Sequence, residues 1–205
     1  MPNYYSSPEH TIAVFDFDGT LTRKDSFKNF LIYTFGFTSF FKGIAINIFP
    51  LTLYILRIIS NHKAKEILFS HFFSGWKEED FQSICTKYAL LNIDSIINNE
   101  ALQKACWHKS EHHVLVIVSA SLTNWISPWA KTNGFIDIIA TEPEIKNGLL
   151  TGKFKTHNCY GKEKLLRFLE RYPARNKYFL YVYGDSVGDK QLLNIADKPF
   201  FRSFH

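Results

Sequence analysis

Three short apolar runs, each followed by an acidic or hydroxyl side chain, constrain the fold of this sequence more than any other feature. The runs cover residues 11–15, 114–118 and 179–183, and they are followed by Asp16, Ser119 and Gly184-Asp185. Each run is apolar at nearly every position rather than at alternate positions, as in parallel strands that are covered on both faces. Residues 136–140 form a fourth candidate strand. The pattern predicts one parallel sheet with polar groups at the carboxyl ends of its strands.

Helical patterns lie between these candidate strands. They cover residues 122–133, 162–171 and 189–196, with Gly134 and Pro173 as the expected stops of the first two. Residues 142–155 contain Asn147-Gly148, which is a hairpin signal. Strands that alternate with helices predict a doubly wound α/β sheet.

The segment from Leu21 to about Glu111 does not follow that alternation. It is long and rich in Phe, Ile and Leu, and residues 63–73 and 78–90 have apolar side chains at helical spacing. We therefore expect residues 1–24 and 112–205 to form the α/β core, and residues 25–111 to form a helical cap inserted after the first strand.

Acidic side chains follow two of the strands, at the sheet edge where open parallel sheets bind ligands. Asp16 and Asp18 are two residues apart in an extended segment, so both carboxylates can face one pocket. Asp185 and Asp189 follow the third apolar run. Carboxylates this close repel one another unless a cation or a proton intervenes, and Mg²⁺ is typically held by a few carboxylates with water and phosphate oxygens. The sequence therefore predicts a Mg²⁺ site.

Such a site suits hydrolysis of a phosphate monoester. With a cation screening its charge, Asp16 can attack phosphorus and form an aspartyl-phosphate. Asp18 can protonate the departing oxygen and then deprotonate the water that hydrolyses the intermediate.

The phosphoryl oxygens also need donors and a basic side chain. Ser119 can supply its hydroxyl together with the neighbouring backbone N–H of Ala120. Lys162 and Lys164 open the helix before the third run, and both are candidates for the basic group.

These residues resemble the haloacid dehalogenase superfamily over essentially the whole chain. Its four motifs stand here in order as Val14-Phe15-Asp16-Phe17-Asp18-Gly19-Thr20-Leu21-Thr22, Val118-Ser119-Ala120-Ser121, Cys159-Tyr160-Gly161-Lys162-Glu163-Lys164 and Tyr183-Gly184-Asp185-Ser186-Val187-Gly188-Asp189. The third resembles a CxGxxK form, which favours Lys164 over Lys162.

The resemblance implies a Rossmann-like core, a nucleophile at Asp16, and Mg²⁺ held by Asp16, the Asp18 carbonyl and Asp185, with Asp189 in support. A helical insertion after the first motif is similar to the subfamily that includes phosphoserine phosphatase, in which an acidic residue nine positions after the nucleophile contacts the substrate. Asp25 has that spacing, and it also suits the N-cap of a helix. Dehalogenases of the superfamily lack the second Asp, so we expect a phosphatase or a phosphotransferase with the same intermediate.

Residues 43–56 of the insertion are uncharged and largely apolar, between Lys42 and Arg57. These 14 residues are too few to cross a bilayer, which takes roughly 20. Two interpretations stay open, a buried cap helix and a patch that meets a bilayer or a lipid tail. The segment is similar to the cap of bacterial phosphatidylglycerophosphate phosphatases of this superfamily. The expected substrate is therefore a small-molecule or a lipid phosphate monoester, and in the second case the cap would contact the membrane peripherally.

Charge and cysteine content limit the other partners. The net charge of +5 suits an anionic substrate, a membrane surface or nucleic acid and does not decide between them. The sequence has no Lys/Arg-rich run or nucleic-acid-binding motif, so no nucleic acid is expected. Three cysteines far apart, with a polar N-terminal segment that lacks a secretion pattern, predict a reducing cytoplasmic setting. A non-enzymatic alternative is a catalytically silent module that binds a membrane or a partner, and the complete set of carboxylates argues against it.

Overall fold

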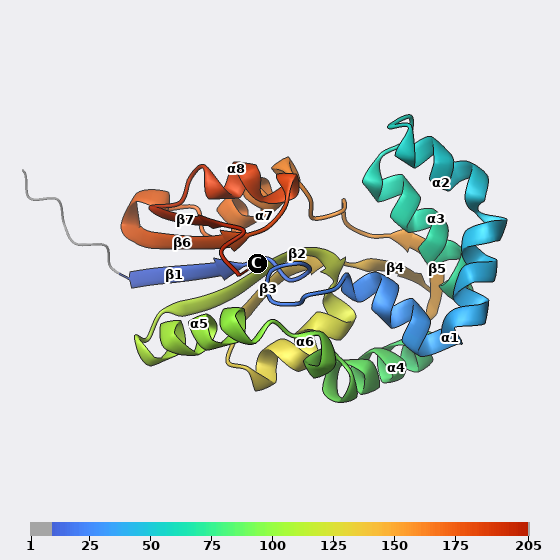
Figure 1. The fold of residues 1–205 in the computed structure, drawn as a ribbon, viewed down its shortest axis with the longest axis horizontal. Coiled ribbons are helices and arrows are strands. Elements are labelled where there is room, and N and C mark those ends of the chain that lie inside the picture. The colour runs from blue at the N-terminus through green and yellow to red at the C-terminus, as the bar shows by residue number, and fades with distance from the viewer. Residues whose placement is uncertain (1–9, 205) are drawn as a thin grey trace, which may run out of the picture.

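The computed structural model describes residues 10–204, and its centre is a five-stranded parallel sheet with helices on both faces (Figure 1). The strands lie in the order β3-β2-β1-β6-β7. Their bounds are β1 His10–Phe15, β2 Val114–Leu122, β3 Asp137–Thr141, β6 Tyr178–Gly184 and β7 Lys198–Phe201. The predicted doubly wound α/β fold and its four strands are confirmed, and β7 is an additional edge strand.

Alternation along the central strands divides the core into two layers. Ile12 and Val14 of β1 belong to the apolar cluster that includes Phe168, whereas Ala13 and Phe15 belong to the cluster on the other face. Two helices cover each face, as Figure 1 shows. These are α7 Lys162–Arg171 and α8 Lys190–Leu193 on one side, and α5 Asn99–Ser110 and α6 Thr123–Thr132 on the other.

One of the three helices predicted in the core has the expected bounds, and two differ. The helix α7 has the predicted bounds. The helix α6 begins at Thr123 rather than Leu122, because β2 continues through an irregular pairing with β3 to Leu122. The predicted last helix, residues 189–196, is shorter, with a 3₁₀ turn at Val187–Asp189 followed by α8. Further 3₁₀ turns cover Ile93–Ile96 and Arg175–Lys177.

Helices beyond the carboxyl ends of the strands form the cap. They are α1 Ser26–Ile46, α2 Ile48–Ile55, α3 Asn61–Phe73 and α4 Glu78–Leu91. The predicted hairpin is present as β4 Pro143–Lys146 and β5 Leu149–Phe154. It lies beside α3, and the N–H of Phe154 donates to Oε1 of Glu66 at 3.1 Å.

The chain leaves the sheet and returns to it at neighbouring positions. The N–H of Arg23 donates to the carbonyl of Ile96 at 2.7 Å, and the N–H of Asn98 donates to the carbonyl of Leu21 at 2.8 Å. The two connections between core and cap therefore run side by side. The division at residues 25–111 stays a prediction, and α5, which falls within that range, packs against β2.

One aromatic cluster joins the cap to the core. Phe30 of α1 packs against Phe73 of α3 and Tyr88 of α4, and its ring also lies 4.7 Å from the ring of Trp125 in α6. All four side chains belong to the same buried cluster as β1 and β2. The buried aromatic residues of the insertion thus fill the space between cap and sheet.

The apolar segment 43–56 is not a buried helix, so that interpretation is wrong. It contains the end of α1 and the whole of α2, and α2 has no buried residue. Within residues 10–204, no single helix is both long and apolar enough to cross a membrane, but α1 and α2, bent by 72°, meet that test as a pair. The polar N-terminal segment used in the localisation argument lies outside the described residues, apart from His10.

Candidate active site

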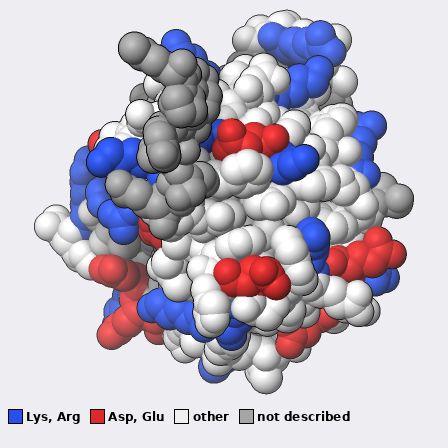
Figure 2. All heavy atoms as spheres, turned by 90° about the vertical axis from the view of Figure 1, so that its left-hand side faces the viewer, with Lys and Arg blue, Asp and Glu red and all other residues white. Residues whose placement is uncertain are grey.

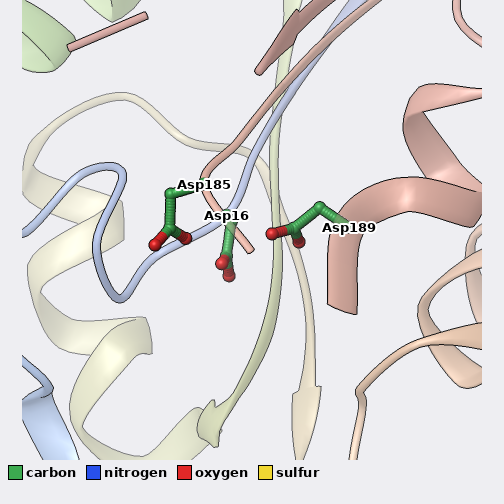
Figure 3. Close-up of side chains that lie close together, drawn as sticks. All are labelled: Asp16, Asp185 and Asp189. Carbon is green, nitrogen blue, oxygen red and sulfur yellow. The ribbon is translucent and has the colours of Figure 1, made fainter. Parts of the chain in front are cut away.

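Three carboxylates meet at the carboxyl end of the central strands. Asp16 follows β1, and its N–H donates to the carbonyl of Tyr183 in the adjacent strand β6 at 2.9 Å. Asp185 follows β6, and Asp189 ends the 3₁₀ turn that comes next. Figure 3 shows Asp16 between the other two, and one carboxylate oxygen from each lies within 4.8 Å of the others. The structure therefore brings together three of the predicted acidic residues.

Gly19 allows the loop after β1 to approach Asp185 closely. Its φ is +80°, which an L side chain rarely adopts, and a Cβ at this position would overlap the Asp185 carboxylate. A larger residue would therefore displace Asp185 or the loop, so the glycine shapes the acidic cluster.

Lys164 is the basic side chain that reaches the cluster. Its Nζ lies 2.7 Å from Oδ1 of Asp16 and 2.6 Å from Oδ1 of Asp189, and all three side chains are buried. Burial opposes the charge of the ammonium, but Asp16 and Asp189 outweigh it and raise the pKa of Lys164 above its ordinary value. Lys162, two residues earlier in α7, is exposed. The geometry thus brings Lys164 rather than Lys162 to Asp16.

The other oxygen of Asp189 is held by the turn that carries it. Oδ2 accepts hydrogen bonds from the N–H of Ser186 at 3.0 Å and from its hydroxyl at 2.9 Å. Because both carboxylate oxygens already have donors, Asp189 suits a supporting role, in which it orients Lys164.

Burial is the main electrostatic influence on Asp16, which is 7% exposed. It raises the pKa of the Asp16 carboxyl to about 8, against the opposing charge of Lys164. Oδ1 accepts from the N–H of Phe17 at 2.7 Å and faces Lys164 as well. The ionised carboxylate therefore depends on neighbouring donors and cations.

Asp18 is held by two serines that the sequence argument did not assign to the site. The N–H of Ser26, the first residue of α1, donates to Oδ1 at 2.7 Å, and the hydroxyl of Ser121 donates to Oδ2. The Ser26 hydroxyl donates to Ser121 at 3.1 Å and accepts from the indole N–H of Trp125 at 3.2 Å. Burial and the charge of Asp25 raise the pKa of Asp18, while Lys65 and the two serines lower it.

The loop after β2 faces the cap helix α3. Ser119 is buried, and its Oγ accepts from the N–H of Ser121 at 3.0 Å. The carbonyl of Ala120 accepts from Nζ of Lys65 in α3 at 3.0 Å. Lys65 therefore places a cap cation next to the expected phosphate-binding loop, and no local sequence pattern indicates this contact.

Asp25 is the N-cap of α1 in this structure. Its Oδ1 accepts from the N–H of Lys28 at 2.8 Å, and its side chain is exposed. Its charge still acts on Asp18, which places Asp25 near the site. The capping interpretation therefore describes the observed contact, and contact with a substrate stays a prediction.

The acidic cluster fits a hard divalent cation. Asp16 and Asp185 offer oxygen donors at one sheet edge, Gly19 leaves room beside Asp185, and Asp189 is already engaged. A site with a small number of carboxylates, completed by water and phosphate oxygens, suits Mg²⁺ better than it suits a softer metal.

Comparison with known proteins agrees with this geometry. Residues 13–194 match the haloacid dehalogenase-like hydrolase family. Protein CicA of Caulobacter vibrioides is 29% identical over 199 residues, which cover 96% of this chain and 87% of CicA. These similarities do not test the expected resemblance of the cap to phosphatidylglycerophosphate phosphatases, which stays a prediction.

Solved structures share the fold. A protein of unknown function from Bordetella pertussis Tohama I superposes with a TM-score of 0.78 at 22% identity, covering 90% of this chain and 86% of that one. A phosphoserine phosphohydrolase-like protein from Francisella tularensis superposes with a TM-score of 0.64 at 17% identity, covering 93% and 85%.

Proposed function

Because the chain belongs to the haloacid dehalogenase-like hydrolase family, we propose that it is a Mg²⁺-dependent phosphatase that hydrolyses a phosphate monoester through an aspartyl-phosphate on Asp16. The observation that carries the proposal is the position of Asp16, which lies beside Asp185 and 2.7 Å from Lys164 at the end of the central strand. The phosphoserine phosphohydrolase-like fold of the Francisella protein supports a small phosphate monoester as substrate.

Asp16 would act as the nucleophile, and Lys164 would stabilise charge. The ammonium of Lys164 is fixed by Asp16 and Asp189, so it needs no rearrangement when negative charge develops on the phosphoryl oxygens. Ser119 and the N–H of Ala120 would bind the same phosphoryl group. When bound by Asp16, the Asp18 carbonyl and Asp185, Mg²⁺ would neutralise charge on the phosphate and the nucleophile.

Asp18 would move protons in both halves of the reaction. It would first donate a proton to the departing oxygen and later accept one from the water that attacks the aspartyl-phosphate. Ser26 and Ser121 hold the two oxygens of this carboxylate, so the start of cap helix α1 contributes to its orientation. The burial of Asp16 would limit access of water during the first step.

Replacing the nucleophile tests the proposal directly. Asp16→Asn should abolish hydrolysis of p-nitrophenyl phosphate in Mg²⁺, while Asp80→Asn, at the exposed start of α4, should keep the wild-type rate. EDTA should stop turnover and added Mg²⁺ should restore it. Acid-quenched wild-type enzyme should carry phosphate on the peptide that contains Asp16. Substantial turnover by Asp16→Asn, with circular dichroism showing an intact fold, would remove Asp16 from this role.

A lipid phosphate monoester is the second candidate substrate, in which the same chemistry would act at a membrane surface. The exposed apolar side chains of α2 favour it, because they lie in the cap, which would select the leaving group. A short-chain lipid phosphate should then have a higher kcat/KM than a soluble ester of the same leaving-group pKa. Equal values would favour a soluble substrate.

Phosphotransfer through the same aspartyl-phosphate differs from hydrolysis only in the molecule that accepts the phosphoryl group. If an added alcohol captures the phosphoryl group from Asp16 in preference to water, the product will be a new phosphate ester rather than inorganic phosphate. Release of inorganic phosphate alone, at millimolar alcohol, would assign hydrolysis.

A further inference from the structure

A group of large apolar side chains is exposed on one part of the cap, and we call it the α2 face. Each of its members is between 58% and 75% exposed. They are Phe37, Phe41, Ile46, Ile48, Phe49, Ile55, Leu56 and Ile58. Isolated exposed apolar residues are ordinary on protein surfaces, but a group of them within one short segment of the chain indicates an interaction site.

Helical spacing groups six of these side chains, four along α2 and two along α1. Ile48 and Ile55 are seven residues apart in α2, as are Phe49 and the C-cap residue Leu56, so the two pairs lie on one side of the helix. Phe37 and Phe41 of α1 are four residues apart and share a side in the same way. Half-buried Leu51 and Leu53 lie between the exposed positions of α2. The helix therefore presents an apolar stripe to solvent.

The segment that carries the α2 face has basic residues but no acidic ones. Between Asp25 and Glu66 the sequence has no acidic residue, whereas it has five basic ones. They are Lys28, Lys42, Arg57, Lys63 and Lys65. By contrast, Figure 2 shows acidic and basic side chains interspersed on the face at the opposite end of the molecule, where β1 begins. Lys63 pairs with Glu66 at 3.5 Å and Lys65 binds the carbonyl of Ala120, whereas Lys42 and Arg57 are exposed. A surface that combines exposed Phe and Ile with exposed Lys and Arg is complementary to an anionic bilayer.

We infer that the α2 face docks on an anionic lipid bilayer, with α2 lying along the interface and its apolar side chains inserted among the lipids. Lys42 and Arg57, which are exposed at either end of the apolar segment, would lie at the level of the lipid head groups. The inference extends the second candidate function, hydrolysis of a lipid phosphate, and its relevance to catalysis rests on that function.

The position of α2 in the chain connects this surface to the active site. The preceding helix α1 begins at Ser26, whose N–H bonds Asp18, and the following helix α3 carries Lys65, whose Nζ bonds the carbonyl of Ala120. Docking would therefore place the bilayer beside the two cap helices that contact the catalytic loops. A substrate whose phosphate sits at a lipid surface could then reach the site without leaving the membrane.

Vesicle flotation tests the docking separately from catalysis. The Asp16→Asn chain, which should be inactive, is mixed with vesicles of phosphatidylcholine, with or without phosphatidylglycerol, at physiological salt. It should float with the anionic vesicles and stay below the neutral ones. Ile55→Glu in the same background should reduce the floated fraction at least tenfold. The matched control is Ile136→Glu, because Ile136 is 72% exposed against 75% for Ile55 and lies beside β3; it should float like its parent.

Three outcomes would overturn the inference. The first is an absence of flotation with anionic vesicles, and the second is an equal loss for Ile55→Glu and Ile136→Glu. The third is self-association in the absence of lipid that Ile55→Glu disperses, since a second copy of the chain would then cover the α2 face. Hydrolysis of p-nitrophenyl phosphate by the wild-type chain reports on the phosphatase proposal alone, so failure of either proposal is recognised without the other.

Discussion

The ammonium of Lys164 lies 2.7 Å from Oδ1 of Asp16, and both side chains are buried at the end of the central strand. This pair sets a fixed positive charge next to the carboxylate that would attack phosphorus. Burial strengthens the attraction between the two charges, since neither group is screened by water, but it also opposes ionisation of Asp16.

Replacement of Lys164 should therefore lower the rate far more than replacement of its neighbour Lys162. Lys164→Met removes the fixed charge that faces the phosphoryl group, and we expect kcat/KM to fall by about 10²- to 10³-fold. Lys162→Met, in the same turn but exposed, should change it less than twofold. Steady-state kinetics with p-nitrophenyl phosphate measures both. Equal losses of kcat/KM in the two variants would show that the buried contact between Lys164 and Asp16 has no special part in catalysis.

Replacement of Ser121 should affect poor leaving groups most. Ser121→Ala removes the hydroxyl that donates to Asp18, so the carboxyl loses a partner that orients it for proton transfer. We expect the rate on alkyl phosphates to fall by about 10²-fold, and the burst of p-nitrophenolate, which leaves without a proton, to fall much less. Ser110→Ala, at the exposed end of α5, is the control. Parallel losses on both substrates would indicate a structural role only.

Two glycines with the same backbone conformation allow the effect of backbone strain to be distinguished from an effect on metal binding. Gly19 has φ +80° and Gly75 has φ +82°, but only a Cβ at Gly19 would meet another group, the Asp185 carboxylate. Gly19→Ala and Gly75→Ala should each lower the free energy of unfolding by about 1 kcal/mol. Only Gly19→Ala should raise the Mg²⁺ concentration required for half-maximal activity. An unchanged Mg²⁺ requirement would contradict the proposal that Asp185 binds Mg²⁺.

A buried histidine should make the fold sensitive to acid. His108 is fully buried, with its ring nitrogens 2.7 Å from Nδ1 of His113 and 2.9 Å from the Tyr183 hydroxyl, and burial lowers its pKa from 6.5 to about 3. Between these values the unfolded chain binds a proton that the folded chain does not, so stability decreases as the pH falls below 6.5.

The corresponding variant isolates that contribution. His108→Gln should reduce the loss of unfolding free energy between pH 7 and pH 5 by about 2 kcal/mol at most, as measured by urea denaturation at both pH values. His71→Gln replaces an exposed histidine of α3 and should leave the loss unchanged. The same pH dependence in wild type and His108→Gln would exclude His108 as its source.

Local patterns were sufficient to predict four of the five strands of the sheet and the acidic residues of the site. Apolar runs followed by Asp16 and Asp185 predict strand ends directly, and the bounds of α7 follow from its apolar spacing and from Pro173. The edge strand β7 was missed because it is short and contains Pro199, which is unusual within strands except at an edge.

Contacts between distant segments could not be predicted in this way. The Ser26 hydroxyl reaches Ser121, 95 residues away in the sequence, and Lys65 reaches the carbonyl of Ala120, 55 residues away. Nothing in the local sequence indicates either contact. The apolar segment around Phe49 shows that local sequence also does not determine whether a segment is buried. Its composition suggested burial as one interpretation, but burial depends on what other elements cover, and none of the described elements buries α2.

The aromatic cluster around Phe30 and Trp125 has a consequence for how the molecule loses its structure. Because these rings belong partly to the cap and partly to the sheet, separating the two parts would expose a large apolar area to water. Large excursions of the cap are therefore costly, and loss of the cap removes support from the sheet. Heating should accordingly melt both parts in a single cooperative transition, in which calorimetric and van't Hoff enthalpies coincide.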